Sequence, residues 1–256
     1  MRIIKVCVLA ARNLIPHTMD YGASLTVFKA QTENVRSLNQ AIKQIKRAIN
    51  ASLRSSDFTS ANVQTKILAL TFSAWAEARF SKLIHTPHGF DLSEILQIKT
   101  IQKQYGLEQG WEKCLELALR KVSASRRGNE IPNKRQEISR IIKTYIIEPS
   151  LLRNKIAHGQ WKIALNRNND AENPEFTAKL RDLDVIAVSI WLQAYEFLAR
   201  IIEDLIESPN KAFRRNYWLH LTELENFLEK AKSWTLQKKI EDLKLKPRTH
   251  RESLKR

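Results

Sequence analysis

Apolar residues recur every three or four positions along most of the chain, and this spacing places them on one face of an α-helix. Glycine and proline, which interrupt helices, number only six and seven in 256 residues. The pattern therefore predicts an all-α protein, a helical bundle. The clearest apolar stripes are Leu38, Ile42, Ile45 and Ile49; Ile138, Ile141, Ile142 and Tyr145; and Val188, Trp191, Tyr195, Leu198, Ile202 and Leu205. Residues 61–86 are expected to form a long buried helix, with Val63, Ile67, Leu70, Ala74 and Ala78 and the aromatic residues Phe72, Trp75 and Phe80.

The ends of the chain are less regular than its middle. Residues 1–33 are interrupted by Pro16 and Gly22, and we expect a short element there, packed on the edge of the domain. The tail from Lys238 has eight basic and three acidic residues and little to bury, which predicts a frayed or disordered segment. No tandem repeat or linker interrupts the pattern, so residues 1–256 are expected to form one domain. Between the ends, helices are predicted from about residue 35 and over 61–86, 91–102, 110–122, 138–148, 151–158, 183–207 and 221–231.

A proline precedes the most informative helix. Pro149 cannot continue a helix and disfavours helical geometry in the residue before it. Ser150 then stands where an N-cap belongs, and residues 151–158 are predicted to form a new helix. Leu152 and Ile156 lie four positions apart and can face the core.

Three polar side chains of this helix are candidates for chemistry. Asn154 and His158 are four apart and share a face, and Arg153 lies beside that face. A permanent cation, an amide and a titratable base presented to one spot would suit a phosphodiester. Gly159 follows directly, and it either ends the helix or allows another backbone to approach closely.

The charge of the chain points to a polyanionic partner. The formal net charge is +16 and the pI is near 9.9, and such an excess attracts nucleic acid. Residues 36–54 contain five basic residues and no acidic one, and residues 120–143 contain eight basic and two acidic residues. Both runs are either solvated faces or surfaces that track phosphates. Residues 123–133 are predicted to form an exposed loop, and the basic residues expected to guide RNA are Arg126, Arg127, Lys134 and Arg135.

Other polar residues have less specific interpretations. Glu77 is the only acidic residue of its predicted helix, and it either pairs with a cation such as Arg153 or reaches solvent at the helix edge. His85 and His88 flank Pro87 and favour a helix-terminal turn over a metal site. After Gly159, the apolar alternation up to Leu165 fits either the end of a helix or a short extended piece, and residues 166–174 form a polar loop.

Cysteine usage and hydropathy favour a cytoplasmic protein. Cys7 and Cys114 have no spacing typical of zinc or redox motifs and are expected to be buried thiols in a reducing compartment. Lys5 interrupts the short apolar run at the N-terminus, so no signal peptide is expected. No segment is expected to span a membrane, and no metal or other cofactor is expected.

The sequence Arg153-Asn154-Lys155-Ile156-Ala157-His158 resembles the motif of the HEPN superfamily, in which Arg and His flank four to six residues and Asn often follows the Arg. The context from Leu151 to Trp161 is similar to HEPN proteins of bacterial and cyanobacterial defence loci. The resemblance implies a HEPN-type helical bundle, here with additional helices at both ends, that acts as a dimeric, metal-independent ribonuclease. It also implies a supporting acidic residue on an earlier helix, for which Glu77 is the candidate, and a possible antitoxin such as a nucleotidyltransferase-like protein.

The chemistry of RNA cleavage fits the same residues. Without a metal, the 2′-OH attacks the phosphate, which requires a base, an acid for the leaving oxygen and a cation for the developing charge. A two-fold dimer would bring two copies of Arg153 and His158 to one site. Three hypotheses remain open: a ribonuclease in which Arg153, Asn154 and His158 are catalytic, a non-catalytic HEPN-like module that binds RNA or a partner, and a structural bundle.

Overall fold

The computed structural model describes residues 20–122, 130–207 and 216–245, apart from the side chains of residues 130–134, 217 and 218. The all-α prediction is confirmed: the described residues contain helices and one isolated antiparallel bridge, between Leu165 and Glu172, but no strand. In chain order the elements are α1 (Tyr21–Arg54), α2 (Phe58–Ile84), α3 (Leu92–Tyr105), α4 (Leu107–Arg120), α5 (Glu130–Ile142), the π-helical segment η1 (Lys143–Ile147), α6 (Glu148–Ala157), α7 (Pro174–Asp182), α8 (Val185–Glu207), α10 (Tyr217–Ala231) and α11 (Leu236–Leu245).

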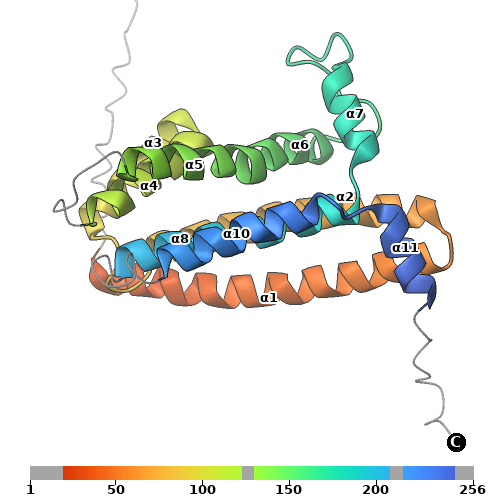
Figure 1. The fold of residues 1–256 in the computed structure, drawn as a ribbon. Helices are drawn as coiled ribbons and strands as arrows, with labels where there is room; N and C mark the ends of the chain where they lie inside the picture. The colour runs from red at the N-terminus through yellow and green to blue at the C-terminus, as the bar shows by residue number, and fades with distance from the viewer. Residues whose placement is uncertain (1–19, 123–129, 208–215, 246–256) are drawn as a thin grey trace, which may run out of the picture.

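Helices α2 and α8 form the centre of the bundle (Figure 1). Helix α1 packs along α2 on one side, and α5, η1 and α6 run along the other side. Helix α10 packs on α8, while α3 and α4 form a hairpin whose second helix contacts α5 and α8. Helix α7 stands away from the end of the bundle beyond α6, and α11 packs on α1. The candidate helix α6 therefore lies at the outer end of one layer, against α2.

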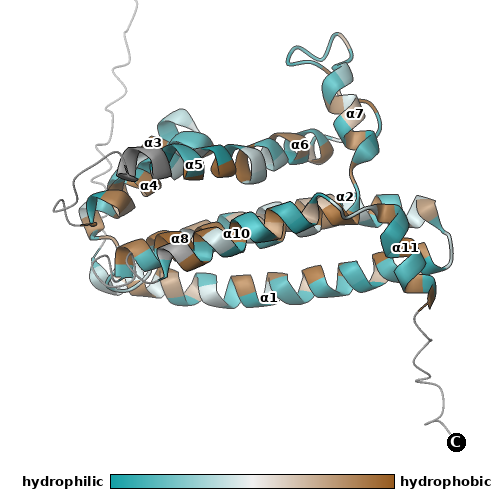
Figure 2. Cartoon of the chain, in the orientation of Figure 1, coloured by the Kyte–Doolittle hydropathy of each residue, from teal (hydrophilic) through white to brown (hydrophobic). Residues whose placement is uncertain are grey.

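The core is built around aromatic rings at the centre of the bundle. Trp75, Trp111 and Tyr195 are each no more than 1% exposed, and the ring of Tyr195 meets the other two edge-on at centroid distances of 5.0 and 5.3 Å. Edge-to-face packing of this kind contributes roughly 0.5–1.5 kcal/mol per pair beyond the burial of area. Figure 2 shows hydrophobic residues concentrated on α8 and at intervals along α1.

One helix of the described residues, α8, is long and apolar enough to cross a membrane by length and composition alone. Its most apolar 18-residue window has a mean hydropathy of 1.5. Half of the window is buried inside the bundle, where Leu198 and Ile202 are fully enclosed. A core helix that is covered on several sides has the same composition as a membrane span.

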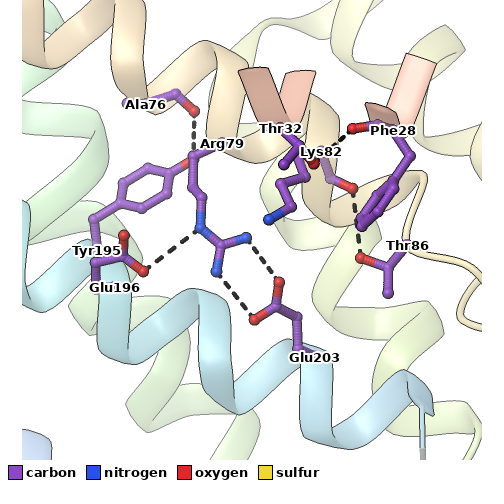
Figure 3. A network of polar contacts seen from close by, with 9 residues as sticks. All are labelled: Phe28, Thr32, Ala76, Arg79, Lys82, Thr86, Tyr195, Glu196 and Glu203. Carbon is purple, nitrogen blue, oxygen red and sulfur yellow. Dashed lines mark hydrogen bonds and ion pairs between the residues drawn. The ribbon is translucent and has the colours of Figure 1, made fainter. Parts of the chain in front are cut away.

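A buried charge network joins α2 to α8 (Figure 3). Arg79, which the sequence reasoning did not single out, donates to both carboxylate oxygens of Glu203 at 2.7 and 3.0 Å and lies 3.5 Å from Glu196. Burial acts to lower the pKa of Arg79, but Glu203 and Glu196 outweigh it and the pKa is raised. Next to this network, the hydroxyl of Tyr195 donates to the carbonyl of Ala76 at 2.6 Å. The central helices are thus fixed in register by polar contacts as well as by packing.

Capping side chains determine where α1 and α3 begin, and the predicted start of α1 was wrong because its cap was not identified. Asp20 caps α1 by accepting from the Ala23 N–H, so the helix begins at Tyr21 and the residues from 21 to 33 belong to it, not to a separate edge element. Residues 1–19, with Cys7, lie outside the described part. Asp91 or Ser93 was expected to cap the helix predicted from residue 91, and Asp91 is the N-cap of α3, in a capping box with Glu94.

Three further boundaries differ from the predictions. Helix α5 already begins at Glu130, so residues 130–133 are helical, while 123–129 lie outside the described residues. Helix α7, capped by Asn173, lies in a stretch for which no helix was predicted. The tail is helical from Leu236 to Leu245 because Ile240 and Leu243 are buried and Arg54 donates to the Leu243 carbonyl at 3.0 Å. The frayed-tail prediction is therefore wrong up to residue 245, and 246–256 lie outside the described part.

Pro149 does not break the helix that contains the motif. Residues 143–147 form a π turn, in which the Glu148 N–H donates to the Lys143 carbonyl five residues earlier. The wider turn accommodates Pro149, which lacks an N–H, in the first turn of α6. Ser150 is consequently inside α6 and is not its N-cap, which corrects both expectations.

Candidate functional site

Helix α6 places Arg153 against the middle of the bundle. Leu152 and Ile156 are buried, as predicted, and fix the orientation of the helix. Arg153 Nη2 lies 2.9 Å from Glu77 Oε1 on α2, so the pairing considered for Glu77 is present. The Arg153 side chain is 26% exposed and that of Glu77 is 63% exposed. Arg153 is thus held by one partner that itself reaches solvent.

Asn154 and His158 lie on the surface at the end of α6. Both residues are exposed, and within the described residues neither side chain makes a hydrogen bond. They line a shallow depression of about 990 Å³ together with the loop that follows the helix. Arg153 instead lines a separate cavity of about 350 Å³, and Asn154 borders both hollows. One chain therefore does not bring Arg153 and His158 into a single hollow.

Gly159 ends the helix in a Schellman motif. Its N–H donates to the Ile156 carbonyl at 3.1 Å, and the Gln160 N–H donates to the Lys155 carbonyl at 3.0 Å. Gly159 has φ +80°, which L residues with a Cβ rarely adopt, and no described atom lies within 4 Å of where a Cβ would be. Of the two interpretations of Gly159, the helix-ending one is confirmed. His158 is the C-cap residue, one position beyond the last helical residue.

The loop after α6 is tied to the helix by side chains that the sequence reasoning did not identify. Lys155 Nζ donates to the Leu165 carbonyl at 2.6 Å, and Trp161 Nε1 donates to the Ile156 carbonyl at 3.0 Å. The side chain of Gln160 accepts from the Leu165 N–H at 2.8 Å. The piece up to Leu165 is irregular and ends in the isolated bridge, so it does not continue the helix. Lys155 lies in the last turn of α6, and Gln160 and Trp161 follow its C-cap closely, but no periodicity in the sequence indicates such contacts.

Only part of the basic run of α1 is free to contact a partner. Lys43 and Arg47 are exposed, and Arg36 is exposed but paired with Glu33 at 2.7 Å. Arg54 is used to hold α11, and Lys46 is half-buried, with its pKa lowered by burial and then by the charge of Lys239. The exposed cations stand at positions 36, 43 and 47, which share one helix face.

The second basic run is only partly described. Arg126 and Arg127 lie outside the described residues, and Lys134 lies in α5 but its side chain is not described. Arg135 is exposed and its Nη2 is 3.9 Å from Glu112 on α4. The role of these four residues in RNA binding remains a prediction.

Among the described residues, the two histidines at the end of α2 and Cys114 are part of the fold and not of the motif. His85 is buried as the C-cap of α2, with Nδ1 2.6 Å from the Ser81 carbonyl, which confirms the helix-terminal turn. His88 follows in that turn with φ +62°. Cys114 is fully buried, and burial raises the pKa of its thiol. Within the described residues, no three His, Cys, Asp or Glu side chains gather as a group able to hold a metal ion.

Comparison with known proteins does not assign the chain to a family: no family model, no curated protein and no solved structure matches it.

Proposed function

We propose that this chain is a HEPN-type, metal-independent endoribonuclease that cleaves single-stranded RNA, acts as a cytoplasmic toxin or defence effector, and works as a homodimer. The observation that carries the proposal is the contact of Arg153 with Glu77 beside the exposed Asn154 and His158. A guanidinium, an amide and an imidazole carried by one short segment are the groups that phosphate transfer requires.

Each residue has a distinct role in this proposal. Arg153 binds the phosphate and stabilises the charge that develops as the 2′-OH attacks. His158 takes or gives the proton, since an imidazole is the side chain best suited to either proton role. Asn154 borders both hollows and orients either His158 or the phosphate. Glu77 is a positioning residue that holds Arg153 through one of its terminal nitrogens.

The separation of Arg153 and His158 favours a composite site at a dimer interface. In one chain they line different hollows, so the Arg153 of one protomer would meet the His158 of its partner across a two-fold axis. Two exposed apolar side chains flank the motif: Leu151 is 48% and Ile163 is 56% exposed. Apolar residues at such positions are suited to burial between copies.

The same separation also supports a second candidate function, a non-catalytic HEPN-like module that binds RNA or a partner protein. If the chains do not pair through α6, Arg153 stays bound to Glu77, and His158 shares its depression with Lys155 and Arg167 but not with Arg153. The exposed Lys43 and Arg47 of α1 would still attract a polyanion. Binding without cleavage distinguishes this candidate from the first.

The deciding measurement is cleavage of single-stranded RNA by the full chain in EDTA. We expect 2′,3′-cyclic phosphate and 5′-OH ends, and we expect DNA to survive because it lacks the 2′-OH. His158→Ala should reduce the rate by about 10²–10⁴-fold, since it removes a proton-transfer group. His88→Asn is the matched control, because His88 is exposed and lies outside the motif. A folded His158→Ala protein that cleaves at the wild-type rate, or a requirement for a divalent ion, would disprove the mechanism.

The composite site is tested by mixing two inactive variants. Arg153→Ala and His158→Ala should each be inactive alone, but a mixed dimer contains one intact pair of Arg153 and His158 across the axis. Cleavage should return after the two variants are unfolded and refolded together. A mixture that stays inactive although mass spectrometry shows mixed dimers, or a wild type that is monomeric at micromolar concentration, rules the shared site out.

RNA binding should depend strongly on salt, because each neutralised phosphate releases condensed counterions. Reversing Arg126 and Arg127 to Glu should weaken binding, measured by fluorescence anisotropy, and reduce the slope of affinity against salt concentration. The chemistry should be unchanged at saturating RNA. Binding that is insensitive to salt would argue against both basic runs as RNA surfaces.

A further inference from the structure

A second hollow, on the other side of Arg153 from the surface depression, has the features of a ligand site. It encloses about 350 Å³ between α2, α3, α4, α6 and α8. Four buried aromatic rings contribute to its wall, and none of them is more than 3% exposed. A cavity of this volume lies at the lower end of the range for small-molecule sites, which are apolar with a few placed polar groups. The rings are Phe72, Phe80, Trp111 and Tyr195.

His85 borders this cavity and also the hollow at the turn after α2, and it has an unused hydrogen-bonding atom. The residue lines the cavity and is 2% exposed, and in the described parts of the chain its Nε2 has no hydrogen-bond partner. A carbonyl can only accept, so the contact with Ser81 places the ring hydrogen on Nδ1. Burial lowers the pKa of His85 and Lys99 lowers it further, against the effect of the Ser81 carbonyl, so the ring is neutral near pH 7. Nε2 is then an acceptor that requires an N–H or O–H donor.

Two cations and one acid give the cavity a net positive charge. Arg153 and Lys99 line it together with Glu77. Glu77 contacts only Nη2 of Arg153, and Arg153 Nε is buried with no partner among the described residues. Lys99 is exposed and makes no described ion pair. One positive charge in the wall is therefore left uncompensated, which favours an anionic group on whatever binds there.

We propose that this cavity binds a small aromatic anion: a planar ring that packs among Phe72, Phe80, Trp111 and Tyr195, donates an N–H or O–H to His85 Nε2, and places an acidic group at Arg153 or Lys99. The ring would gain area and edge or face contacts with the aromatic wall. The donor would satisfy a buried atom that is otherwise unpaired, and such atoms discriminate strongly against ligands that lack the matching group. This site goes beyond the ribonuclease, and its binding is measured without RNA.

Indole-3-acetate is a suitable probe, since it combines a bicyclic ring, one N–H and one carboxylate. Three relatives change one feature each: benzothiophene-3-acetate lacks the N–H, tryptamine replaces the anion by a cation, and acetate lacks the ring. Calorimetry on the full chain gives the affinities, and the indole N–H resonance of Trp111 reports where the ligand lies. We expect saturable binding of indole-3-acetate with a shift of the Trp111 resonance. Benzothiophene-3-acetate should bind about 3–10-fold more weakly, from the loss of one hydrogen bond.

Variants of the lining residues identify each contact. His85→Phe should abolish the difference between indole-3-acetate and benzothiophene-3-acetate. Lys99→Gln should weaken binding of both by up to about tenfold, which corresponds to one partly exposed charge. Lys103→Gln is the matched control, because Lys103 is exposed on the same helix but does not line the cavity. Ser150→Phe, which places a ring at the half-buried edge of the cavity, should block binding.

The outcomes are separable from those of the ribonuclease. If indole-3-acetate does not perturb Trp111 at millimolar concentration, or if tryptamine or acetate binds equally well, the cavity is not a site for aromatic anions. Equal effects of Lys99→Gln and Lys103→Gln would place the ligand elsewhere on the basic surface and overturn the assignment. If His85→Phe fails to fold, the pair of ligands with and without the N–H still tests the donor in the wild-type protein.

Discussion

Two arginine–glutamate contacts meet helix α2 within three residues of each other, and they differ in almost every respect. Arg79 on α2 makes two hydrogen bonds to Glu203 and a third contact to Glu196, and its side chain is 7% exposed. Glu77 on α2 makes one contact with Arg153, and both side chains of that pair are more open to solvent. Residues two apart on a helix point in nearly opposite directions, so the two contacts face different layers of the bundle.

The difference separates an arginine that stabilises the fold from one that is available to a ligand. Arg79 uses its full hydrogen-bonding fork within the chain, as a buried charge must. Arg153 leaves Nε unpaired and lines a cavity. An arginine that is held in place but has an unpaired nitrogen can still form hydrogen bonds to a substrate. This contrast between Arg79 and Arg153 is the physical basis for proposing a functional site at α6 and not at the centre of the bundle. The following substitutions test it.

The largest effect is expected for Arg79→Met. It leaves Glu203 and Glu196 without their cation between α2 and α8, which should lower the free energy of unfolding by about 3 kcal/mol. Urea unfolding followed by circular dichroism measures the change. Arg36→Met, which breaks only an exposed pair, should change stability by less than about 0.5 kcal/mol. Adding Glu203→Leu to Arg79→Met should recover part of the loss, and a double variant no more stable than the single one would argue against an electrostatic cause.

A smaller effect is expected for Gly159→Ala at the end of α6. The positive φ costs a residue with a Cβ about 1 kcal/mol, whereas the space around the new Cβ is open. Gly159→Asn should cost less, since Asn tolerates this conformation. Thermal unfolding compares both with Gly22→Ala in the first turn of α1, which has no positive φ and should cost less, because its new Cβ would only displace the Asp20 side chain 3.2 Å away. Equal losses at both glycines would show that backbone strain is not the cause.

The smallest effect on stability is expected for Arg153→Met, despite its proposed role in catalysis. Glu77 is 63% exposed and can be solvated when its partner is removed, so the loss should be below about 1 kcal/mol. The same urea experiment applies. A loss as large as that of Arg79→Met would make Arg153 a structural residue and would remove the contrast between the two contacts.

The sequence predicted the parts of this molecule that depend on periodicity. The stripes of α1, α5 and α8 identified buried faces because core residues must recur with the helical period. In α2 the expected burial of Phe72, Trp75, Ala78 and Phe80 is confirmed, but Val63, Ile67 and Ala74 are exposed, so that part of the prediction is wrong. The pairing of Glu77 with Arg153 was one of two expectations for that carboxylate, and both hold, because the pair lies at an exposed edge. Arg79 was overlooked because its partners lie more than a hundred residues later, on α8. No local sequence pattern identifies partners that are so far apart along the chain.

The errors at α6 and α11 have a different origin. Pro149 was interpreted through the geometry of the α-helix, in which it ends the element, but the preceding π turn tolerates it. Residues 236–245 were interpreted through their charge, but two apolar side chains and the Arg54 hydrogen bond to the backbone are enough to hold them on α1. In both cases tertiary packing decided between local conformations of similar energy.

Because of the π turn at residues 143–147, the direction in which Arg153 points depends on how many residues precede it in this turn as well as on its own side chain. An α-helix turns by about 100° per residue, and the π turn accommodates one residue more than an α turn, so a return to α geometry with all residues retained would rotate α6 by about that angle relative to α5 and turn Arg153 away from Glu77. Deletion of one residue together with a return to α geometry would instead leave the orientation of α6 unchanged. The orientation of α6 against α2 at the candidate site therefore depends on the number of residues in the π turn.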